Sequence, residues 1–270
     1  MTDSVSAQSD LSGALLWDGL SLTKFRAPRQ RRDLVSRGAL LARTAALIEQ
    51  HPFTLVCAPA GFGKSTLLLQ LAQQLPADHQ VVWLSLDGDD NDPNRLFVSL
   101  VAALRELPLR WDVEPRLLAA QVNGPGQANR TITSVLANAL ASLNTERLVL
   151  FLDDLHCVND ASALQLLADL VDRLPPAVSL VAGSRVEPAL PLARWRVRGE
   201  LGQIVAADLQ FDQAEAESLA RRRHGDHGGA AVPADGVPVS ADRASQASRP
   251  WRLRYLKAEL MKHLWSGLAN

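Results

Sequence analysis

The stretch from Phe53 to Leu75 limits the possible folds of this chain more than any other part. Phe53 to Cys57 is a short apolar run of the kind found in buried strands, and Lys64 to Leu75 has the apolar spacing of a helix. Between them lies a loop of small residues, A-P-A-G-F-G, which K-S-T follows. A strand, a tight loop and a helix that begins with Lys and a hydroxyl residue together indicate a phosphate-binding loop.

Each residue type in this loop has a chemical reason. Gly61 and Gly63 can adopt dihedrals closed to other residues and let the backbone approach phosphate oxygens. We expect Lys64 to bridge the β- and γ-phosphates of ATP and the Ser65 hydroxyl to ligate Mg²⁺. The backbone amides expected to surround the β-phosphate, at the positive end of the helix dipole, are those of Ala60, Gly61, Phe62, Gly63, Lys64, Ser65 and Thr66.

Ala58 stands where the usual G-x-x-x-x-G-K-S/T spacing has its first glycine. Alanine is the smallest residue with a Cβ atom and suits the turn if its φ stays negative, so we expect only a mild weakening. The alternative for the whole loop is a glycine-rich turn between a strand and a helix, with Lys64 in solvent.

A second candidate group ends the apolar run from Arg147 to Asp154. Acidic residues are rarely placed at the end of a buried strand for packing, so Asp153 and Asp154 suggest chemistry. We expect Asp153 to hold Mg²⁺ through water, and Asp154 to orient or deprotonate the attacking water. The alternative is an acidic turn that caps the next helix.

Two further residues are candidates for the same site. Arg185 follows the apolar run Val178 to Ser184, and an arginine at this edge can contact a γ-phosphate in bidentate fashion. Its alternative is a surface arginine in a loop. His156 can contact the same cluster, although a structural histidine with satisfied hydrogen bonds is the simpler interpretation.

These runs belong to a regular alternation of strand and helix patterns. The alternation predicts an α/β fold: a three-layer sandwich with a central parallel sheet and helices on both faces. Asp92 is expected to cap a helix that has Pro93 at its first position. Further strands are expected at residues 81–87 and 202–209, and further helices at 38–50 and 162–174.

Composition narrows the functional class. Hydrophobic residues make up 47% of the 270, which allows a substantial core, and a net charge of −1 argues against a surface built for nucleic acid. Cys57 and Cys157 are expected as unpaired core residues of a reducing compartment. No basic region precedes Lys24 and no uncharged apolar stretch is long enough to span a membrane, so we expect a cytoplasmic protein without a membrane partner.

Several stretches together resemble one family. They are VCAPAGFGKSTLL, VVWLSLDGDDNDPNRLFVSLVAAL, LVLFLDDLH, LVAGSRVEPALPLARWRVRGEL and VAADLQFDQAEA. In their order and spacing they are similar to the N-terminal nucleotide-binding module of the large ATP-binding, LuxR-type transcriptional regulators of the maltose-regulator kind. These regulators belong to the signal-transduction (STAND) branch of P-loop ATPases, related to the AAA+ enzymes, in which alanine at the position of Ala58 is common.

The resemblance implies more than the residues alone. It implies a P-loop NTPase with strand order 5-1-4-3-2, and it places Leu34 and Val35 beside the adenine. It also implies a switch, in which ADP holds a closed monomer and ATP permits self-association. The basic stretch Thr23 to Arg37, which contains these two residues, by itself indicates a solvated loop.

The two ends of the chain differ from the middle. We expect a flexible leader at residues 1–22, the ATPase domain at 23–222 and a disordered basic tail at 223–270, which is rich in Gly, Pro and Ser. The resemblance stops near residue 220, before the family's winged-helix, sensor and DNA-binding segments, so we expect no specific DNA binding by this chain. The tail is either a shifted reading frame on a truncated product or a genuine linker.

Three functions remain open from the sequence. The first is a regulatory switch that binds ATP or ADP with Mg²⁺ and turns over slowly. The second is a free-standing P-loop ATPase or kinase acting on a small substrate. The third is a non-functional or purely interacting fragment.

Overall fold

Five strands form one parallel sheet in the part of the chain that the structure describes. This computed structural model describes residues 20–29, 35, 37–111, 127–211 and 215, all within the first of two units, Met1–Leu219. The strands are β1 (Phe53–Cys57), β2 (His79–Ser85), β3 (Arg147–Asp153), β4 (Val178–Ser184) and β5 (Leu201–Val205). Their order, β2-β3-β4-β1-β5, is the expected 5-1-4-3-2 order read from the other edge, so the predicted α/β P-loop NTPase fold is confirmed.

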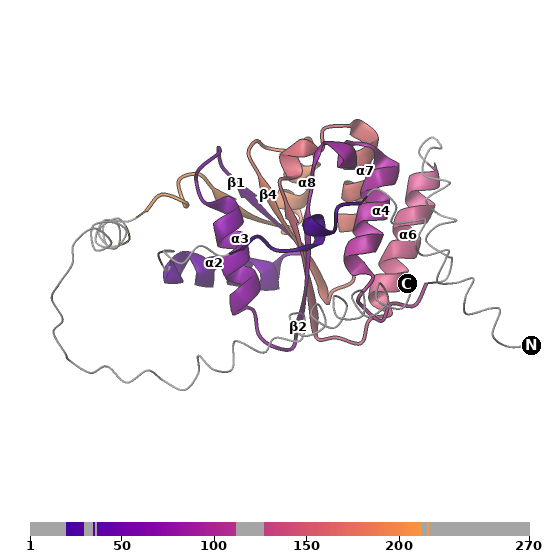
Figure 1. Cartoon of the computed structure of the whole chain (residues 1–270), viewed down its shortest axis with the longest axis horizontal. Helices are drawn as coiled ribbons and strands as arrows, with labels where there is room; N and C mark the ends of the chain where they lie inside the picture. The colour runs from indigo at the N-terminus through magenta and orange to yellow at the C-terminus, as the bar shows by residue number, and fades with distance from the viewer. Residues whose placement is uncertain (1–19, 30–34, 36, 112–126, 212–214, 216–270) are drawn as a thin grey trace, which may run out of the picture. The chain divides into compact units, whose positions relative to one another are not determined.

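Helices cover both faces of this sheet (Figure 1). On one face lie α2 (Gly38–Gln50) and α3 (Lys64–Gln74); on the other lie α4 (Pro93–Leu104), α6 (Gln127–Ala141), α7 (Ala161–Val171) and the short α8 (Leu192–Val197). Three short 3₁₀ turns complete the described elements: η1 (Leu22–Phe25), η2 (Gly88–Asn91) and η3 (Leu155–Cys157).

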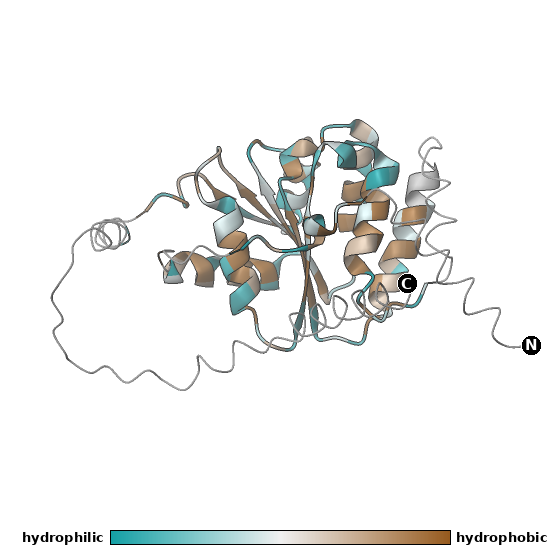
Figure 2. Cartoon of the chain, viewed as in Figure 1, coloured by the Kyte–Doolittle hydropathy of each residue, from teal (hydrophilic) through white to brown (hydrophobic). Residues whose placement is uncertain are grey.

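The strands are apolar on both faces because each face borders its own core. Along β3, Leu148, Leu150 and Leu152 pack into the core under α4, α6 and α7. The intervening Val149 and Phe151 pack into the core under α2 and α3. Successive side chains of a strand point to opposite faces, so a strand covered on both sides is apolar throughout. Figure 2 shows this as brown along the central strands.

Helix starts follow the capping chemistry expected from the sequence. The Asp92 carboxylate accepts a hydrogen bond from the Arg95 amide at 2.9 Å, with Pro93 at the first helical position, so the predicted cap of α4 is confirmed. Helix α7 is capped by Asp160, whose Oδ1 accepts from the amides of Ser162 (2.8 Å) and Ala163 (3.0 Å).

Some boundaries differ from expectation. Strand β2 spans His79–Ser85 instead of 81–87, and β5 spans Leu201–Val205, with 206–209 forming a turn. Helices α6 and α8 have no counterpart in the sequence prediction. Helix α8 has six residues and is held by the buried Trp195, whose ring lies 5.1 Å from that of Phe53. Such a contact between distant residues leaves no local pattern in the sequence.

The expected leader and tail lie outside the described residues, apart from positions 20–22, of which Leu22 begins η1. Cys57 and Cys157 are free and only half-buried, at the ends of β1 and η3. In the described ranges, no helix is long and apolar enough to cross a membrane.

Candidate nucleotide-binding site

The loop between β1 and α3 has the backbone conformation that its glycines were expected to provide. Gly61 and Gly63 have φ of 85° and 84°, and Gly63 is the N-cap residue of α3. A Cβ atom added to either would meet nothing within 4 Å. The glycines are therefore required by their dihedrals, and the space beside them is open to a ligand.

Ala58 takes the place of a glycine without strain. Its amide donates to the Ser184 carbonyl at 3.1 Å, which extends the pairing of β1 with β4, and its side chain is buried. Among the described non-glycine residues only Asp154 has a positive φ, so φ at Ala58 is not in the left-handed region. Alanine was expected to suit this turn if its φ stayed negative, and the structure meets that condition.

Lys64 begins α3 and is 7% exposed, which contradicts the alternative of a solvated lysine. Its Nζ donates to the Pro59 carbonyl of the same loop at 3.0 Å. Burial lowers the pKa of this ammonium group; the Arg185 charge lowers it further, and Asp153 and Asp154 act in the opposite sense. The lysine is thus a buried cation folded over the loop, where an anion would be stabilised.

Asp153 ends β3, is 4% exposed and lies beside α3. Burial raises the pKa of its carboxyl group, and the nearby Ser65 side chain opposes that rise. A hydroxyl and a carboxylate side by side are donors that Mg²⁺ accepts, together with phosphate and water oxygens. No group of three or more His, Cys, Asp or Glu side chains with metal-binding geometry occurs in the described residues, so the pair has no larger protein cage around it.

Asp154 adopts a left-handed conformation, with φ of 59° and ψ of 37°. Its side chain is 41% exposed and makes no hydrogen bond to cap η3, while α7 is capped by Asp160. The Asp154 side chain therefore caps neither helix, although the residue stands at the N-cap position of η3. Asp154 is held in the turn with its carboxylate toward solvent at the edge of the site.

Arg185 follows β4, which lies between β1 and β3 as the strand order required. Its side chain is exposed. Burial lowers the pKa of both Lys64 and His156, and the Arg185 charge lowers both further. The structure thus brings Arg185 near the loop lysine and the turn after β3. The half-buried His156 departs from expectation, because its Nδ1 atom is buried and has no hydrogen-bond partner among the described residues.

Gly183 is a site residue that the sequence analysis missed. A Cβ atom there would lie 2.9 Å from Oδ1 of Asp153 and 3.0 Å from Cδ1 of Leu68. Glycine therefore lets Asp153 and α3 approach β4 closely. The signal was present, since a glycine inside an apolar strand pattern often marks a close approach.

The segment expected beside the adenine is only partly described. Leu34 lies outside the described residues, and Val35 is buried, with its carbonyl accepting from Nε2 of Gln70 on α3 at 3.3 Å. This contact ties the segment to the helix that follows the phosphate loop. Gln70 was not predicted as a contributor.

The basic segment is not simply a solvated loop. Lys24 is buried and pairs with Asp90 at 2.6 Å and Asp87 at 2.9 Å. Arg37 donates to the Leu209 carbonyl at 2.9 Å and pairs with Glu215 at 3.2 Å. These cations hold the segment against the β2–α4 loop and against the residues after β5.

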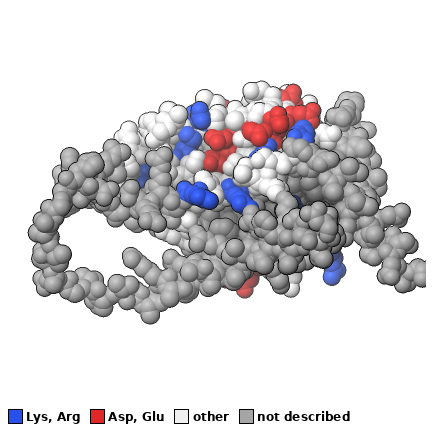
Figure 3. Space-filling model, in the orientation of Figure 1, with Lys and Arg blue, Asp and Glu red and all other residues white. Residues whose placement is uncertain are grey.

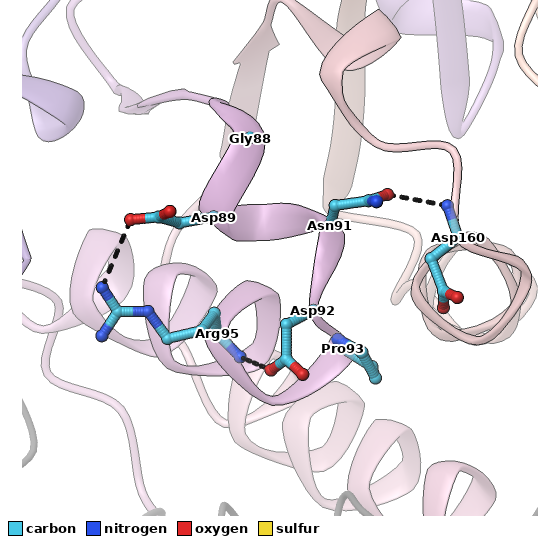
Figure 4. A pocket seen from close by; sticks show the side chains of 7 residues that line it. All are labelled: Gly88, Asp89, Asn91, Asp92, Pro93, Arg95 and Asp160. Carbon is cyan, nitrogen blue, oxygen red and sulfur yellow. Dashed lines mark hydrogen bonds and ion pairs between the residues drawn. The ribbon is translucent and has the colours of Figure 1, made fainter.

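A separate hollow lies at the same edge of the sheet (Figure 4). It is lined by residues of the β2–α4 connection, the first turn of α4 and the cap of α7: Gly88, Asp89, Asn91, Asp92, Pro93, Arg95 and Asp160. Figure 3 shows acidic side chains gathered along this side of the molecule. Two of the lining carboxylates cap helices, and their charge disfavours a phosphate, so this hollow is not the phosphate site.

Comparisons with known proteins identify the family of this chain. The family model described as AAA ATPase domain matches residues 33–182, more than half of the chain. The chain is 30% identical over 219 residues to the serine/threonine-protein kinase PknK of Mycobacterium tuberculosis, covering 78% of this chain and 18% of the kinase. It is 28% identical over 199 residues to the HTH-type transcriptional regulator MalT of Serratia proteamaculans, covering 73% of this chain and 21% of the regulator.

The chain therefore spans about a fifth of the length of these curated relatives. Among solved structures, a Walker-type ATPase of Pyrococcus abyssi is 15% identical, with a TM-score of 0.46 over 80% of this chain and 64% of that one. The family match covers the phosphate loop, the Asp153 strand and most of β4. The chain belongs to the AAA ATPase domain family and is a P-loop ATPase module related to MalT-like regulators.

Proposed function

We propose that this chain is an ATP- and ADP-binding switch module of a MalT-like transcriptional regulator, and that it hydrolyses ATP slowly with Mg²⁺. One observation carries the proposal: the open loop of Gly61 and Gly63 borders the buried Lys64, whose Nζ bonds only a loop carbonyl among the described residues, and Ser65 lies near Asp153. A nucleoside triphosphate and a hard divalent cation are the ligands that fit such a combination.

The residues have separate roles in binding. Lys64 exchanges its bond to the Pro59 carbonyl for the β- and γ-phosphate oxygens, and the loop amides from Ala60 to Thr66 donate to the β-phosphate. Ser65 and Asp153 would hold Mg²⁺, Asp153 through water, and the ion would neutralise charge on the phosphates. Val35 lies beside the adenine.

Hydrolysis needs an oriented water and a stabilised γ-phosphate. Asp154 accepts a hydrogen bond from the attacking water and then one of its protons, which passes on to solvent. As the bond from the water oxygen to the γ-phosphorus forms, the bond to the bridging oxygen breaks, and ADP leaves with that electron pair. Arg185 donates to the γ-phosphate oxygens and so distinguishes ATP from ADP.

The switch consists of a difference in conformation between the ATP- and ADP-bound states. Slow turnover suits that role, because each state must last long enough to be read by other parts of the protein. Self-association in the ATP state is the output we propose for the module, and ATP should therefore raise its mass in light scattering whereas ADP should not.

The binding site is tested by calorimetric titration of the chain with ATP and ADP, with and without Mg²⁺. Lys64→Ala should weaken ATP binding about 100-fold, since a charge-assisted contact contributes roughly 1.5–3 kcal/mol. Arg198→Ala is the matched control, because it also removes one cation. Arg198 follows α8 and lies two residues before Glu200, whose carbonyl accepts from the amide of Phe53 at the start of β1. Equal ATP affinity of Lys64→Ala and the wild type would contradict the site.

The hydrolytic step needs its own measurement. Asp154→Asn should bind ATP normally and release phosphate about 100-fold more slowly, because proton transfer by a positioned group contributes about 10²- to 10⁴-fold. Rapid turnover by the wild type would instead favour a free-standing ATPase over a switch.

A further inference from the structure

The turn after β3 contains two features that packing does not explain. Asp154 has a left-handed backbone although it is not glycine, the single such case among the described residues. Two positions later, Nδ1 of His156 is buried without a hydrogen-bond partner among the described residues. Strained backbone and unsatisfied buried polar atoms both carry a cost, and they concentrate at functional sites.

The two features face each other. Nδ1 of His156 lies 3.8 Å from Oδ1 of Asp154, which is too far for a hydrogen bond and within reach of a small movement. The histidine side chain is 17% exposed, whereas the aspartate side chain is 41% exposed. The imidazole is therefore the more enclosed member of the pair, and the carboxylate has more open space around it.

Burial and the charges around the imidazole of His156 decide whether it meets Asp154 as a neutral hydrogen-bond donor or as a cation. Burial lowers the pKa of His156, and the Arg185 and Lys64 charges act in the same sense, while Asp154 and Asp153 oppose them. A neutral imidazole holds one N–H proton and accepts at its other nitrogen. His156 is thus suited to donate a single hydrogen bond to Asp154 and not to act as its counterion.

We propose that His156 is a positioning residue: in the nucleotide-bound state its Nδ1–H donates to the Asp154 carboxylate and aims that carboxylate at the attacking water. This role rests on the proposed function of the site. Hydrogen bonds of catalytic groups are often long in the free protein and shorten in the reactive complex, which the 3.8 Å separation fits. His156 itself touches neither the water nor the phosphates.

The test compares replacements that differ in where they place a donor. His156→Asn keeps an N–H close to the position of Nδ1, His156→Gln carries it further out, and His156→Phe keeps the ring shape without a donor. In single-turnover hydrolysis, with protein in excess over ATP, the Phe and Gln variants should be about 10- to 100-fold slower, the loss expected when a reacting group is misplaced by about 1 Å. The Asn variant should recover most of the rate.

Two further readouts separate positioning from a merely structural role. ATP affinity should be the same in all three variants, because His156 contacts no part of the nucleotide. In an Asp154→Asn background, His156→Phe should cause no further loss of rate, since its effect passes through that carboxylate. His51→Phe is the control, because His51 precedes β1, bonds the carbonyl of Gly199 and lies outside the site.

Three results would overturn the role: an unchanged rate in His156→Phe, no recovery in His156→Asn, or an equal loss in the Asp154→Asn background. A wild type that binds ATP without hydrolysing it would overturn this role and the hydrolytic step together, leaving the binding site intact. Failure of the binding site itself shows separately, as a wild type without ATP affinity or with affinity independent of Lys64.

Discussion

Two lysines of this domain are buried to the same extent and differ in what surrounds them. Lys24 in η1 and Lys64 at the start of α3 are each 7% exposed. Lys24 contacts two carboxylates, those of Asp90 and Asp87, and Asp90 also accepts from the Ser99 hydroxyl at 2.7 Å. Lys64 donates to a carbonyl of its own loop, and its pKa is lowered chiefly by burial.

The difference separates structure from function. A buried cation that is matched by carboxylates fixes two segments together, here the N-terminal segment and the β2–α4 loop. A buried cation without such a match costs stability until an anion arrives. The same residue type at the same burial therefore joins two segments in one place and prepares a ligand site in the other. Replacing Lys24 should lower the stability of the domain, whereas replacing Lys64 should lower its affinity for ATP.

The largest expected effect is at Lys24. Lys24→Met should destabilise the domain by about 3–5 kcal/mol, because it leaves the fully buried Asp90 without its cation. Arg43→Met is the matched control, since it breaks the exposed pair of Arg43 with Asp208 and should cost less than about 1 kcal/mol. Urea unfolding measures both, and similar losses in the two variants would contradict the structural role of Lys24.

The next effect concerns the close approach of β4 to Asp153. Gly183→Ala should cost about 1–3 kcal/mol, because its Cβ would lie 2.9 Å from the Asp153 carboxylate. Gly202→Ala should cost a similar amount, since its Cβ would lie 2.9 Å from Thr54 Oγ1. Only Gly183→Ala should also reduce the effect of Mg²⁺ on ATP affinity; if both or neither variant does so, Gly183 has no special relation to the cation site.

A smaller effect of opposite sign is expected at the other lysine. Without nucleotide, Lys64→Met should be as stable as the wild type or more stable by up to about 1 kcal/mol. The reason is that the substitution removes a buried charge that bonds only a carbonyl of its own loop. ATP should then raise the melting temperature of the wild type and not that of the variant. A loss of stability in nucleotide-free Lys64→Met would show that this lysine also serves the fold.

The smallest effect is a dependence on pH. The pKa of Lys64 is lower in the folded chain than its ordinary value of 10.5, so the unfolded chain binds more protons between those two values. Stability of the wild type relative to Lys64→Met should therefore rise with pH through that window. Unfolding curves of the two proteins at increasing pH up to about 10.5 measure it, and a constant difference would argue against an unmatched charge.

Much of the fold was accessible from local patterns. The limits of β1, α2 and β4 and the cap of α4 follow from apolar runs, spacing and N-cap chemistry, and the structure confirms them. The strand order was expected from a resemblance and not from the strands themselves. Helix α8 was missed because six residues give too short a pattern, and contacts with distant residues hold it, among them Trp195 with the Phe53 ring and with Asp172.

By itself, the sequence determined the parts of the site that depend on backbone chemistry: a strand, two glycines able to take positive φ, and a lysine and hydroxyl at a helix start. Only the tertiary structure decided which cation is matched, because Asp90 reaches Lys24 across 66 positions of sequence. It likewise decided that Gly183 must be glycine and that Nδ1 of His156 is left facing Asp154. Dihedral preferences act within a few residues, whereas burial and charge pairing depend on which distant segments the fold brings together.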